Sequence, residues 1–130
     1  MEKEFFIPDW SGKTILVAED VDSNYMVLSA LLRKTKVSVL RATNGQEALE
    51  MIQQHPQIIA ILMDISMPGM DGIEATRLIK ENFPDKIIIV QTAHARDMYR
   101  DKMNAEGCND YLLKPLRQKM LIETLSKYLS

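Results

Sequence analysis

The chain has 130 residues, of which 46% are hydrophobic, and this is enough for one domain with a sizeable core. Its 16 lysine and arginine residues and 18 aspartate and glutamate residues give a formal net charge of −2 at pH 7. A mildly acidic chain is not attracted to polyanions, so the charge argues against a general nucleic-acid binder or membrane-surface binder. The single cysteine, Cys108, excludes an internal disulfide and is typical of a reducing compartment.

The sequence also argues against a membrane-spanning segment, a signal peptide and a structural zinc site. No stretch of about 18 apolar residues is present, and the charged N-terminus lacks the apolar core of a signal peptide. One cysteine and two widely separated histidines also argue against a structural zinc site. We therefore expect a cytoplasmic protein with no membrane segment in this chain.

The first residues differ in character from the rest of the chain. Residues 1–13 are interpreted as an N-terminal tail or linker remnant, and residues 14–130 as the domain. Aromatic residues, among them Phe6 and Trp10, gather in the tail, where proline and glycine break any regular period. Two interpretations stay open: the aromatic side chains pack on the domain, or the tail is what remains of an interdomain linker.

Five short apolar segments have the pattern of strands. They span residues 14–18, 37–40, 58–63, 86–90 and, more weakly, 110–113. The middle segments are continuously apolar rather than alternating, which is typical of strands buried on both faces of a parallel sheet.

Apolar stripes with i, i+3, i+4 spacing lie between these segments and predict helices. The stripes consist of Leu28, Leu31 and Leu32; Gly45, Ala48, Leu49 and Ile52; Ala75, Leu78 and Ile79; and Leu121, Leu125, Tyr128 and Leu129. Residues 96–106 predict a fifth and weakest helix, because Met98 and Met103 are their only large aliphatic side chains. Asn44, followed three residues later by Glu47, resembles a capping box at the start of the second helix.

The alternation of five strands with five helices predicts an α/β domain with a doubly wound parallel sheet. Binding sites in such sheets form beyond the carboxyl ends of the strands. The segments at those ends are residues 19–22, 64–72, 91–95 and 113–116.

Polar residues at four of these strand ends fit a single site. Glu19 and Asp20 follow the first strand, Asp64 the third, Thr92 ends the fourth, and Lys114 follows the fifth. Three converging carboxylates repel one another unless a proton or a cation is bound, and an all-oxygen site suits Mg²⁺ or Mn²⁺. A cation, a lysine and a hydroxyl can neutralise three phosphoryl oxygens. The pattern therefore predicts that Asp64 accepts a phosphoryl group by nucleophilic attack.

Each of these residues alone also has an ordinary structural interpretation. An aspartate after a strand is commonly a turn residue or helix cap, and Glu19 and Asp20 can cap a helix that begins near Asp22. Lys114 alone can be a solvated surface lysine. Only their joint placement at four ends of one sheet favours a site.

The segment Pro68–Gly72 after the third strand is dense in turn-forming residues. Either Gly69 or Gly72 can take a positive φ without strain. We expect this turn to shape the loop after Asp64 and to lead into a helix from Ile73.

Four segments of the chain resemble the motifs of the receiver domain of two-component response regulators. They are Ile15–Asp20, Leu62–Gly72, Thr92–Ala93 and Tyr111–Pro115, and the resemblance covers about residues 13–129. The resemblance implies a flavodoxin-like doubly wound sheet of five parallel strands in the order 2-1-3-4-5, with five helices.

The resemblance also implies a role for each site residue. Asp64 would be the phosphoacceptor, Asp20 a direct Mg²⁺ ligand, Glu19 an acidic residue that reaches the metal through water, and the Ser66 backbone carbonyl the remaining protein ligand. Glu19 departs from the commonest Asp-Asp pair, and its longer side chain should still reach the metal.

The resemblance implies further roles around the phosphoryl group. Thr92 would donate a hydrogen bond to it, and Lys114 would pair with it through a turn with a cis bond to Pro115. Tyr111 would turn inward on activation. Ser66 and His94 occupy positions that tune how fast the phosphoryl group is hydrolysed.

The partners implied are a histidine kinase or a histidine phosphotransfer protein, and a downstream protein that docks on the face of residues 96–129. No DNA-binding module is present in this chain, so no direct contact with nucleic acid is expected. The segments Asp9–Lys13 and Asn44–Leu49 resemble receivers of hybrid sensor histidine kinases and favour that origin over a stand-alone regulator. The parent protein would then be a histidine kinase, whereas the isolated domain would be a switch that promotes its own phosphorylation and dephosphorylation.

Two other classes of protein stay open at this stage. An aspartate-nucleophile phosphatase would resemble Asp-x-Asp after the first strand, whereas here the acceptor follows the third strand and Ser66 stands at the third place. A flavodoxin-like flavin-binding protein would need a glycine-rich, hydroxyl-rich loop after the first strand, where Glu19 and Asp20 would instead repel a phosphate. An absorbance spectrum would detect a bound flavin.

Overall fold

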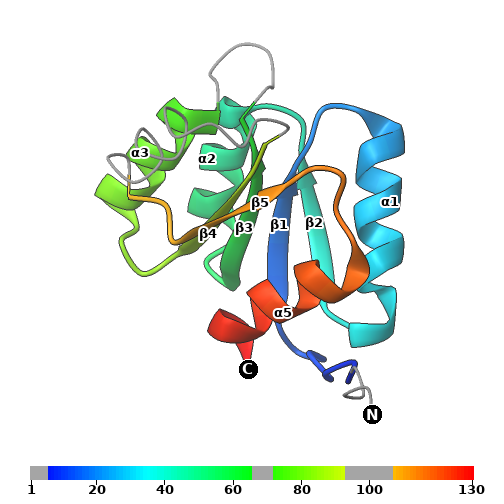
Figure 1. Ribbon diagram of the computed structural model, residues 1–130. Helices are drawn as coiled ribbons and strands as arrows, with labels where there is room; N and C mark the ends of the chain where they lie inside the picture. Colours follow the sequence, from blue (N-terminus) through cyan, green and yellow to red (C-terminus); the bar gives the residue numbers. More distant parts are fainter. Residues whose placement is uncertain (1–5, 66–71, 93–106) are drawn as a thin grey trace.

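The computed structural model describes residues 6–65, 72–92 and 107–130, and the fold is given for these ranges. Five parallel strands form one sheet in the order β2-β1-β3-β4-β5 (Figure 1). The strands are β1 (Thr14–Ala18), β2 (Ser38–Ala42), β3 (Ile58–Asp64), β4 (Ile87–Thr92) and β5 (Asp110–Leu113). This order confirms the predicted flavodoxin-like sheet, in which the crevice lies where the strand order reverses, between β1 and β3.

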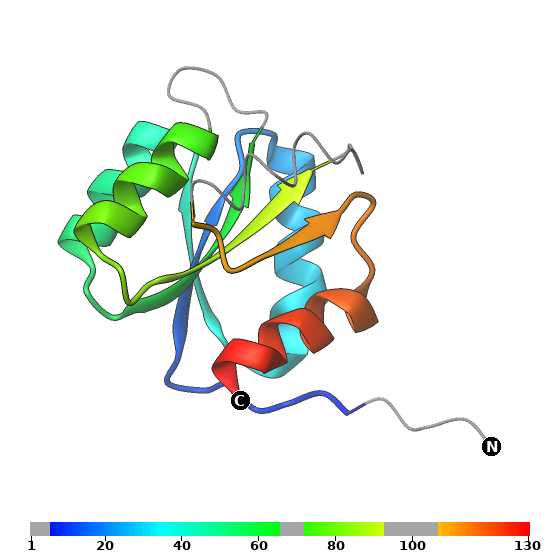
Figure 2. The same cartoon turned by 60° about the vertical axis from the view of Figure 1, so that its left-hand side comes forward.

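Helices cover both faces of the sheet. They are α1 (Asp22–Leu32), α2 (Gly45–Gln54), α3 (Gly72–Asn82) and α5 (Gln118–Leu129), with a 3-10 turn over Arg33–Thr35. In Figures 1 and 2, α2 and α3 lie on one face and α1 and α5 on the other. The fifth predicted helix, residues 96–106, lies outside the described residues. None of the helices in the described ranges has the length and apolar character needed to cross a bilayer.

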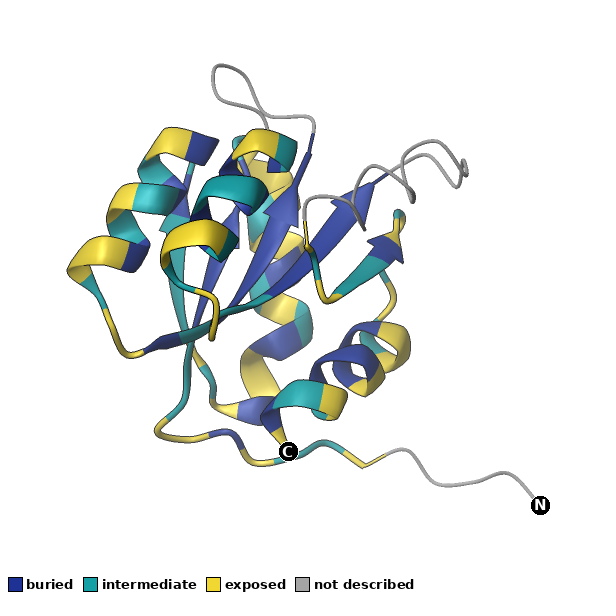
Figure 3. Ribbon diagram, turned by 90° about the vertical axis from the view of Figure 1, so that its left-hand side faces the viewer, coloured by how far each residue is buried: buried dark blue, intermediate teal, exposed yellow. Residues whose placement is uncertain are grey.

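Two hydrophobic clusters fill the spaces between the sheet and the helices. Leu16 and Ala18 of β1 belong to the cluster under α2 and α3, whereas Ile15 and Val17 belong to the cluster under α1 and α5. Successive strand residues thus point to opposite faces, and in the central strands both faces are buried, as the dark blue of β1, β3 and β4 in Figure 3 shows. Burying each such Val, Leu or Ile side chain contributes about 1.5–3 kcal/mol, which explains the continuously apolar strand pattern.

Three strands, β2, β3 and β4, extend further toward their carboxyl ends than the apolar pattern predicts, whereas β1 and β5 end as predicted. The register of β4 and β5 pairs Gln91 with Leu112 and Thr92 with Leu113, so β4 continues to Thr92 rather than ending at residue 90. Backbone pairing therefore continues after the apolar run has ended. As a result, two polar residues of β4 are fixed at the carboxyl edge of the sheet.

The start of α2 differs in one detail from the predicted capping box. The Asn44 side chain accepts a hydrogen bond from the Glu47 backbone N–H at 2.8 Å, as expected for an N-cap. The Glu47 carboxylate, however, accepts from the backbone N–H of Thr43 at 2.8 Å instead of that of Asn44. Both bonds still satisfy exposed backbone donors at the helix start.

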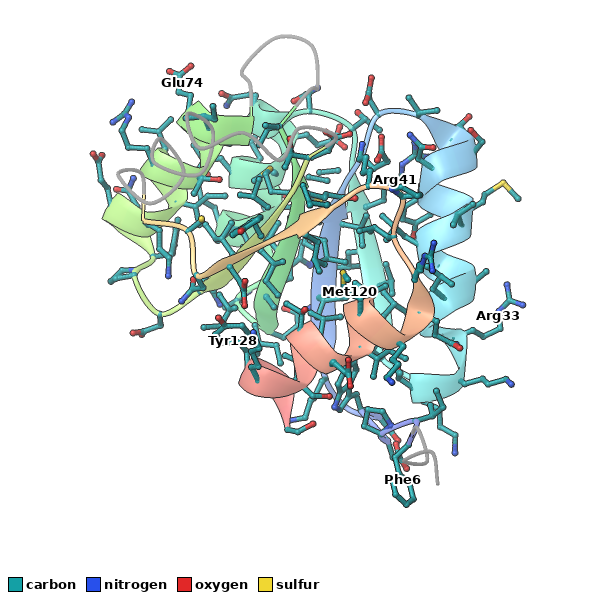
Figure 4. All side chains as sticks on the ribbon, viewed as in Figure 1. Phe6, Arg33, Arg41, Glu74, Met120 and Tyr128 are labelled. Atoms are coloured by element: carbon teal, nitrogen blue, oxygen red, sulfur yellow. The ribbon has the colours of Figure 1, made fainter. Side chains whose placement is uncertain are left out.

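The N-terminal tail is fastened to the domain by one aromatic side chain. Trp10 is 1% exposed, and its indole N–H donates to the Ser130 hydroxyl at 3.1 Å. Its backbone N–H donates to the carbonyl of Thr35 at 2.7 Å. Phe6, in contrast, is 78% exposed and points away from the domain (Figure 4). The packing interpretation of the tail thus holds for Trp10 and is wrong for Phe6.

Candidate functional site

Three carboxylates meet at the carboxyl edge of the sheet, where β1 and β3 end. Asp64 is the last residue of β3, and Glu19 and Asp20 directly follow β1. One carboxylate oxygen of each residue lies within 4.8 Å of the others. The predicted convergence is therefore present, and the carboxyl ends of β1 and β3 that bring it about lie at the upper edge of the sheet in Figure 1.

The burial of these acids follows from the strands that carry them. Glu19 is 0% exposed and Asp64 is 3% exposed, whereas Asp20 is partly exposed. The Glu19 backbone N–H donates to the carbonyl of Ala42 at 2.9 Å, which continues the pairing of β1 with β2 by one residue. The Glu19 carboxylate accepts from the backbone N–H of Val21 at 3.2 Å, so it shapes the turn into α1.

The helix-cap interpretation of the first two acids is not what the structure shows. Helix α1 begins at Asp22 and has no side-chain hydrogen bond at its N-cap, Val21. Glu19 and Asp20 therefore lie in the crevice without capping the helix.

Lys114 is the cation of this cluster. Its ammonium donates to Asp64 Oδ2 at 3.0 Å and lies 3.8 Å from Glu19 Oε1. The lysine backbone N–H donates to the carbonyl of Thr92 at 2.8 Å, which ties the segment after β5 to the end of β4. The predicted cis bond between Lys114 and Pro115 is present. Within the described ranges one lysine faces three carboxylates, so these four side chains together carry more acidic than basic groups.

Burial and neighbouring charges alter the pKa of Glu19. Desolvation raises the pKa of Glu19 above its ordinary value of 4.5, and the nearby Asp64 charge raises it further. The Val21 N–H and the Lys114 ammonium act in the opposite direction but do not compensate. Glu19 Oε1 is buried and has no hydrogen-bond partner among the described residues. A buried carboxylate oxygen that lacks a hydrogen bond is suited to a cation or to a water molecule held by one.

The raised pKa of Glu19 predicts a gain of stability on removing its charge. We expect Glu19→Gln to raise the free energy of unfolding at neutral pH in metal-free buffer, because the folded state then no longer buries a poorly compensated charge. The penalty is absent well below pH 4.5, where the acid is protonated in both states, and grows as pH rises through the higher pKa of the folded state. The gain should therefore vanish at low pH.

Urea unfolding in a chelator at several pH values tests this expectation. Glu123→Gln, at an exposed position of α5, is the matched control and should leave the free energy of unfolding nearly unchanged at every pH. A Glu19→Gln variant that is less stable than the parent at neutral pH would contradict the burial argument.

The remaining predicted site residues divide into two groups. Thr92 is 4% exposed at the end of β4, and Tyr111 of β5 is half-buried against the cluster under α2 and α3. Ser66 and His94 lie outside the described residues. The structure thus assembles the carboxylates and the lysine and places Thr92 on the neighbouring strand end, and the roles of these residues stay predictions.

Gly72 serves the site in a way that differs from the expectation. The described glycines with positive φ are Gly12 and Gly107, so Gly72 does not use the conformational freedom that glycine allows, and Gly69 lies outside the described residues. Gly72 is instead the first residue of α3, where a Cβ atom would stand 2.5 Å from the Asp64 carbonyl oxygen and 2.7 Å from Ile65 Cα. Glycine is required here because the helix start approaches the backbone of the site residue closely.

Sequence reasoning also passed over Arg41, which lies at the carboxyl end of β2. Its Nε–H donates to the carbonyl of Glu19 at 3.1 Å, and its Nη1 lies 2.8 Å from Asp22 Oδ1. An arginine on a strand gives no sequence signal of such contacts, because they depend on the pairing of β2 with β1.

The family of the chain follows from its match to the model of a known protein family. The model of the response regulator receiver domain matches residues 15–126, which is most of the chain. The chain belongs to this receiver-domain family. Membership agrees with the four sequence motifs and with the strand order, and it favours a receiver over the phosphatase and flavin-binding alternatives.

Relatives include both stand-alone regulators and kinases. The polar-differentiation response regulator DivK of Brucella anthropi is 31% identical over 122 residues, which cover 90% of this receiver and 96% of that protein. The signal transduction histidine-protein kinase BarA of Escherichia coli is 35% identical over 117 residues, which cover 88% of this receiver and 13% of that protein. Similarity to the receiver part of a much longer kinase is therefore as strong as similarity to a single-domain regulator.

Two solved structures are similar over nearly the whole chain. One is the receiver domain of a sensor histidine kinase of Pseudomonas aeruginosa with a magnesium ion coordinated in its active site cleft; it has a TM-score of 0.83 and 35% identity and covers 92% of this receiver and 98% of that chain. The other is a receiver domain of Saccharomyces cerevisiae in complex with a histidine phosphotransfer protein; it has a TM-score of 0.85 and 30% identity, with 95% and 91% coverage.

Proposed function

We propose that Asp64 accepts a phosphoryl group from the phosphohistidine of a kinase or phosphotransfer protein in a Mg²⁺-dependent reaction, and that this event switches a docking face. The observation that carries the proposal is the Asp64 carboxylate, which lies 3.0 Å from the Lys114 ammonium inside a cluster of three acids. The similar receiver that is bound to a histidine phosphotransfer protein supports the choice of phosphodonor.

The donor atoms of the cluster fit Mg²⁺. All three side chains offer oxygen, the cluster is reached by solvent at Asp20, and Glu19 Oε1 has no hydrogen-bond partner among the described residues. Asp20 and Asp64 would bind the ion directly and Glu19 through water, together with the backbone carbonyl of Ser66. When bound, the ion supplies positive charge that offsets the phosphoryl oxygens. The similar receiver with coordinated magnesium supports Mg²⁺ rather than Mn²⁺.

In the proposed step, an Asp64 carboxylate oxygen attacks the phosphorus in line with the leaving group. The bond between phosphorus and the partner's histidine nitrogen breaks, and its electron pair remains on the imidazole, which then takes up a proton. Lys114 orients the carboxylate and offsets the charge on the equatorial oxygens. The Thr92 hydroxyl donates to the transferred group, whose later hydrolysis is tuned at residues 66 and 94.

The switch is proposed to act on the face of residues 96–129. Thr92 moves toward the phosphoryl oxygens, which leaves space for Tyr111 to turn inward. The described part of this face contains a hollow of about 470 Å³ lined by residues of β5 and α5, among them Leu113 and Met120. Both of these apolar side chains are exposed, at 36% and 51%, and Met120 is labelled beside the first turns of α5 in Figure 4. This surface suits a downstream protein partner.

The origin of the chain is proposed from its relatives. Its similarity to receiver segments of longer histidine kinases supports a receiver from a hybrid sensor kinase in the cytoplasm, although DivK shows that a whole relative can be this size. In either case the domain itself is a switch that assists its own phosphorylation and dephosphorylation.

Phosphorylation by a small donor tests the proposed function. The protein is incubated with acetyl phosphate in the presence of Mg²⁺ or of a chelator, and its intact mass is followed. We expect a mass gain of one phosphoryl group only with Mg²⁺, and its loss on treatment with hydroxylamine, which cleaves acyl phosphates. No mass gain at saturating Mg²⁺ with acetyl phosphate or phosphoramidate, or a gain that peptide mapping assigns to another residue, would overturn the proposal.

A further inference from the structure

One side chain outside the acidic cluster fastens the loop that carries two of its three acids. Arg41 is the second-last residue of β2, and its Nε–H donates to the Glu19 carbonyl at 3.1 Å. Its Nη1 lies 2.8 Å from Asp22 Oδ1. Its guanidinium also stacks over the Tyr25 ring of α1, 4.7 Å from the centroid. Figure 4 shows Arg41 at the upper end of the sheet, directed toward α1.

These contacts fix the chain on both sides of Asp20. The residue before it, Glu19, is held by its carbonyl to Arg41 and by its backbone N–H to the carbonyl of Ala42. Asp22, two residues after it, is held to the other side of the same guanidinium. A planar guanidinium can make these bonds simultaneously, whereas an ammonium acts as a single point of charge. Asp20 therefore lies between two anchored positions and has little freedom to move away from the cluster.

The contacts of this arginine contribute only modestly to fold stability. The Arg41 side chain is 24% exposed, and its Nη2 is buried with no hydrogen-bond partner among the described residues, which destabilises the folded state. Its ion-pair partner Asp22 is 87% exposed, and an exposed pair contributes at most about 1 kcal/mol. A β-branched residue would suit a strand position better on propensity alone. A partly unsatisfied arginine beside a site is typical of a functional rather than a structural requirement.

Through its charge alone, Arg41 would weaken the binding of a metal ion. A guanidinium that bonds to the backbone of Glu19 repels a divalent cation bound nearby, so removing its charge should tighten binding. Holding the loop has the opposite effect, because a preorganised ligand loses less conformational freedom on binding. The two roles therefore predict opposite outcomes for the same substitution.

We propose that Arg41 is a positioning residue for Mg²⁺ binding, because it holds residues 19–22 in the conformation that presents Asp20 beside Asp64. This inference rests on the proposed function, since it assumes that the acidic cluster binds Mg²⁺. It adds a residue on β2, outside the four strand-end motifs, to those that determine the affinity of the site.

Calorimetric titration of metal-free protein with Mg²⁺, without any phosphodonor, tests the proposal. Arg41→Lys keeps the charge but loses the bond to the Glu19 carbonyl and the planar stacking on Tyr25. We expect it to bind Mg²⁺ about tenfold more weakly than the parent, the effect of losing roughly one charge-assisted hydrogen bond. Arg41→Gln, which also loses the repulsive charge, should be weakened less than Arg41→Lys. Arg33→Lys, an exposed arginine directed away from the site in Figure 4, is the matched control and should bind as the parent does.

The outcomes separate positioning from charge and from folding. Urea unfolding in a chelator, at the temperature of the titration, checks that every variant is fully folded without urea. For fully folded variants, a merely structural role would leave the Mg²⁺ dissociation constant unchanged. An Arg41→Lys protein that binds as the parent does, or an Arg41→Gln protein that binds more tightly, would overturn the positioning role and leave the proposed function intact. A parent protein that binds no Mg²⁺ would overturn both.

Discussion

Asp64→Asn is expected to abolish phosphate incorporation from acetyl phosphate in the presence of Mg²⁺, with the intact mass unchanged after a reaction time that fully labels the parent. The amide oxygen of asparagine is neutral and is a poor nucleophile compared with a carboxylate. The substitution also removes the charge that attracts the Lys114 ammonium at 3.0 Å. Glu19 is not expected to replace it, because Glu19 is fully buried and held to the turn by the Val21 N–H.

Loss of labelling must be distinguished from loss of folding. Asp85→Asn makes the same chemical change at an exposed position in the turn before β4, at the opposite end of the sheet, and should be labelled like the parent. The Asp64→Asn protein should retain its far-ultraviolet circular dichroism, since it removes one charge from a mutually repulsive cluster. Full labelling of this variant would exclude Asp64 as the acceptor.

The parts of the fold that the sequence predicts are those determined by local pattern. Continuous apolar runs such as residues 58–63 indicate strands buried on both faces, and the i, i+3, i+4 stripes indicate helices that cover them. Once the sheet is parallel, the carboxyl ends of its strands share one edge, so the meeting of Asp20, Asp64 and Lys114 follows from topology alone.

The parts that it does not predict depend on contacts between distant segments. Arg41 reaches Glu19 only because of the register of β2 with β1, and no local pattern encodes that register for a single arginine. The Trp10 indole N–H donates to Ser130, which is 120 residues away in the chain. The sequence of the tail alone therefore does not identify the partner that buries Trp10. Gly72 likewise depends on a contact with another segment of the chain. The turn-rich sequence around it suggests that glycine is needed for an unusual φ angle, whereas in the structure glycine is needed because the backbone of Asp64 and Ile65 lies too close for a Cβ atom.

That short distance makes Gly72→Ala the most damaging small substitution that we expect near the site. The added Cβ would stand 2.5 Å from the Asp64 carbonyl oxygen and 2.7 Å from Ile65 Cα, and backbone atoms cannot rotate away as a side chain does. Either α3 or the end of β3 must shift, at a cost of about 1–3 kcal/mol in the free energy of unfolding. Alanine is a better helix former than glycine by about 1 kcal/mol, so a net loss of stability reports the clash.

The same shift should also slow phosphorylation, because it moves the backbone that carries the Asp64 carboxylate relative to Lys114. Gly12→Ala separates the two effects: Gly12 has φ +84°, but a Cβ there meets nothing within 4 Å, and the residue precedes β1 at the far end of the sheet. That substitution should lower stability by about 1–2 kcal/mol through left-handed backbone strain and leave the initial labelling rate unchanged. A Gly72→Ala protein with parental stability and parental labelling rate would show that the start of α3 does not constrain the acceptor.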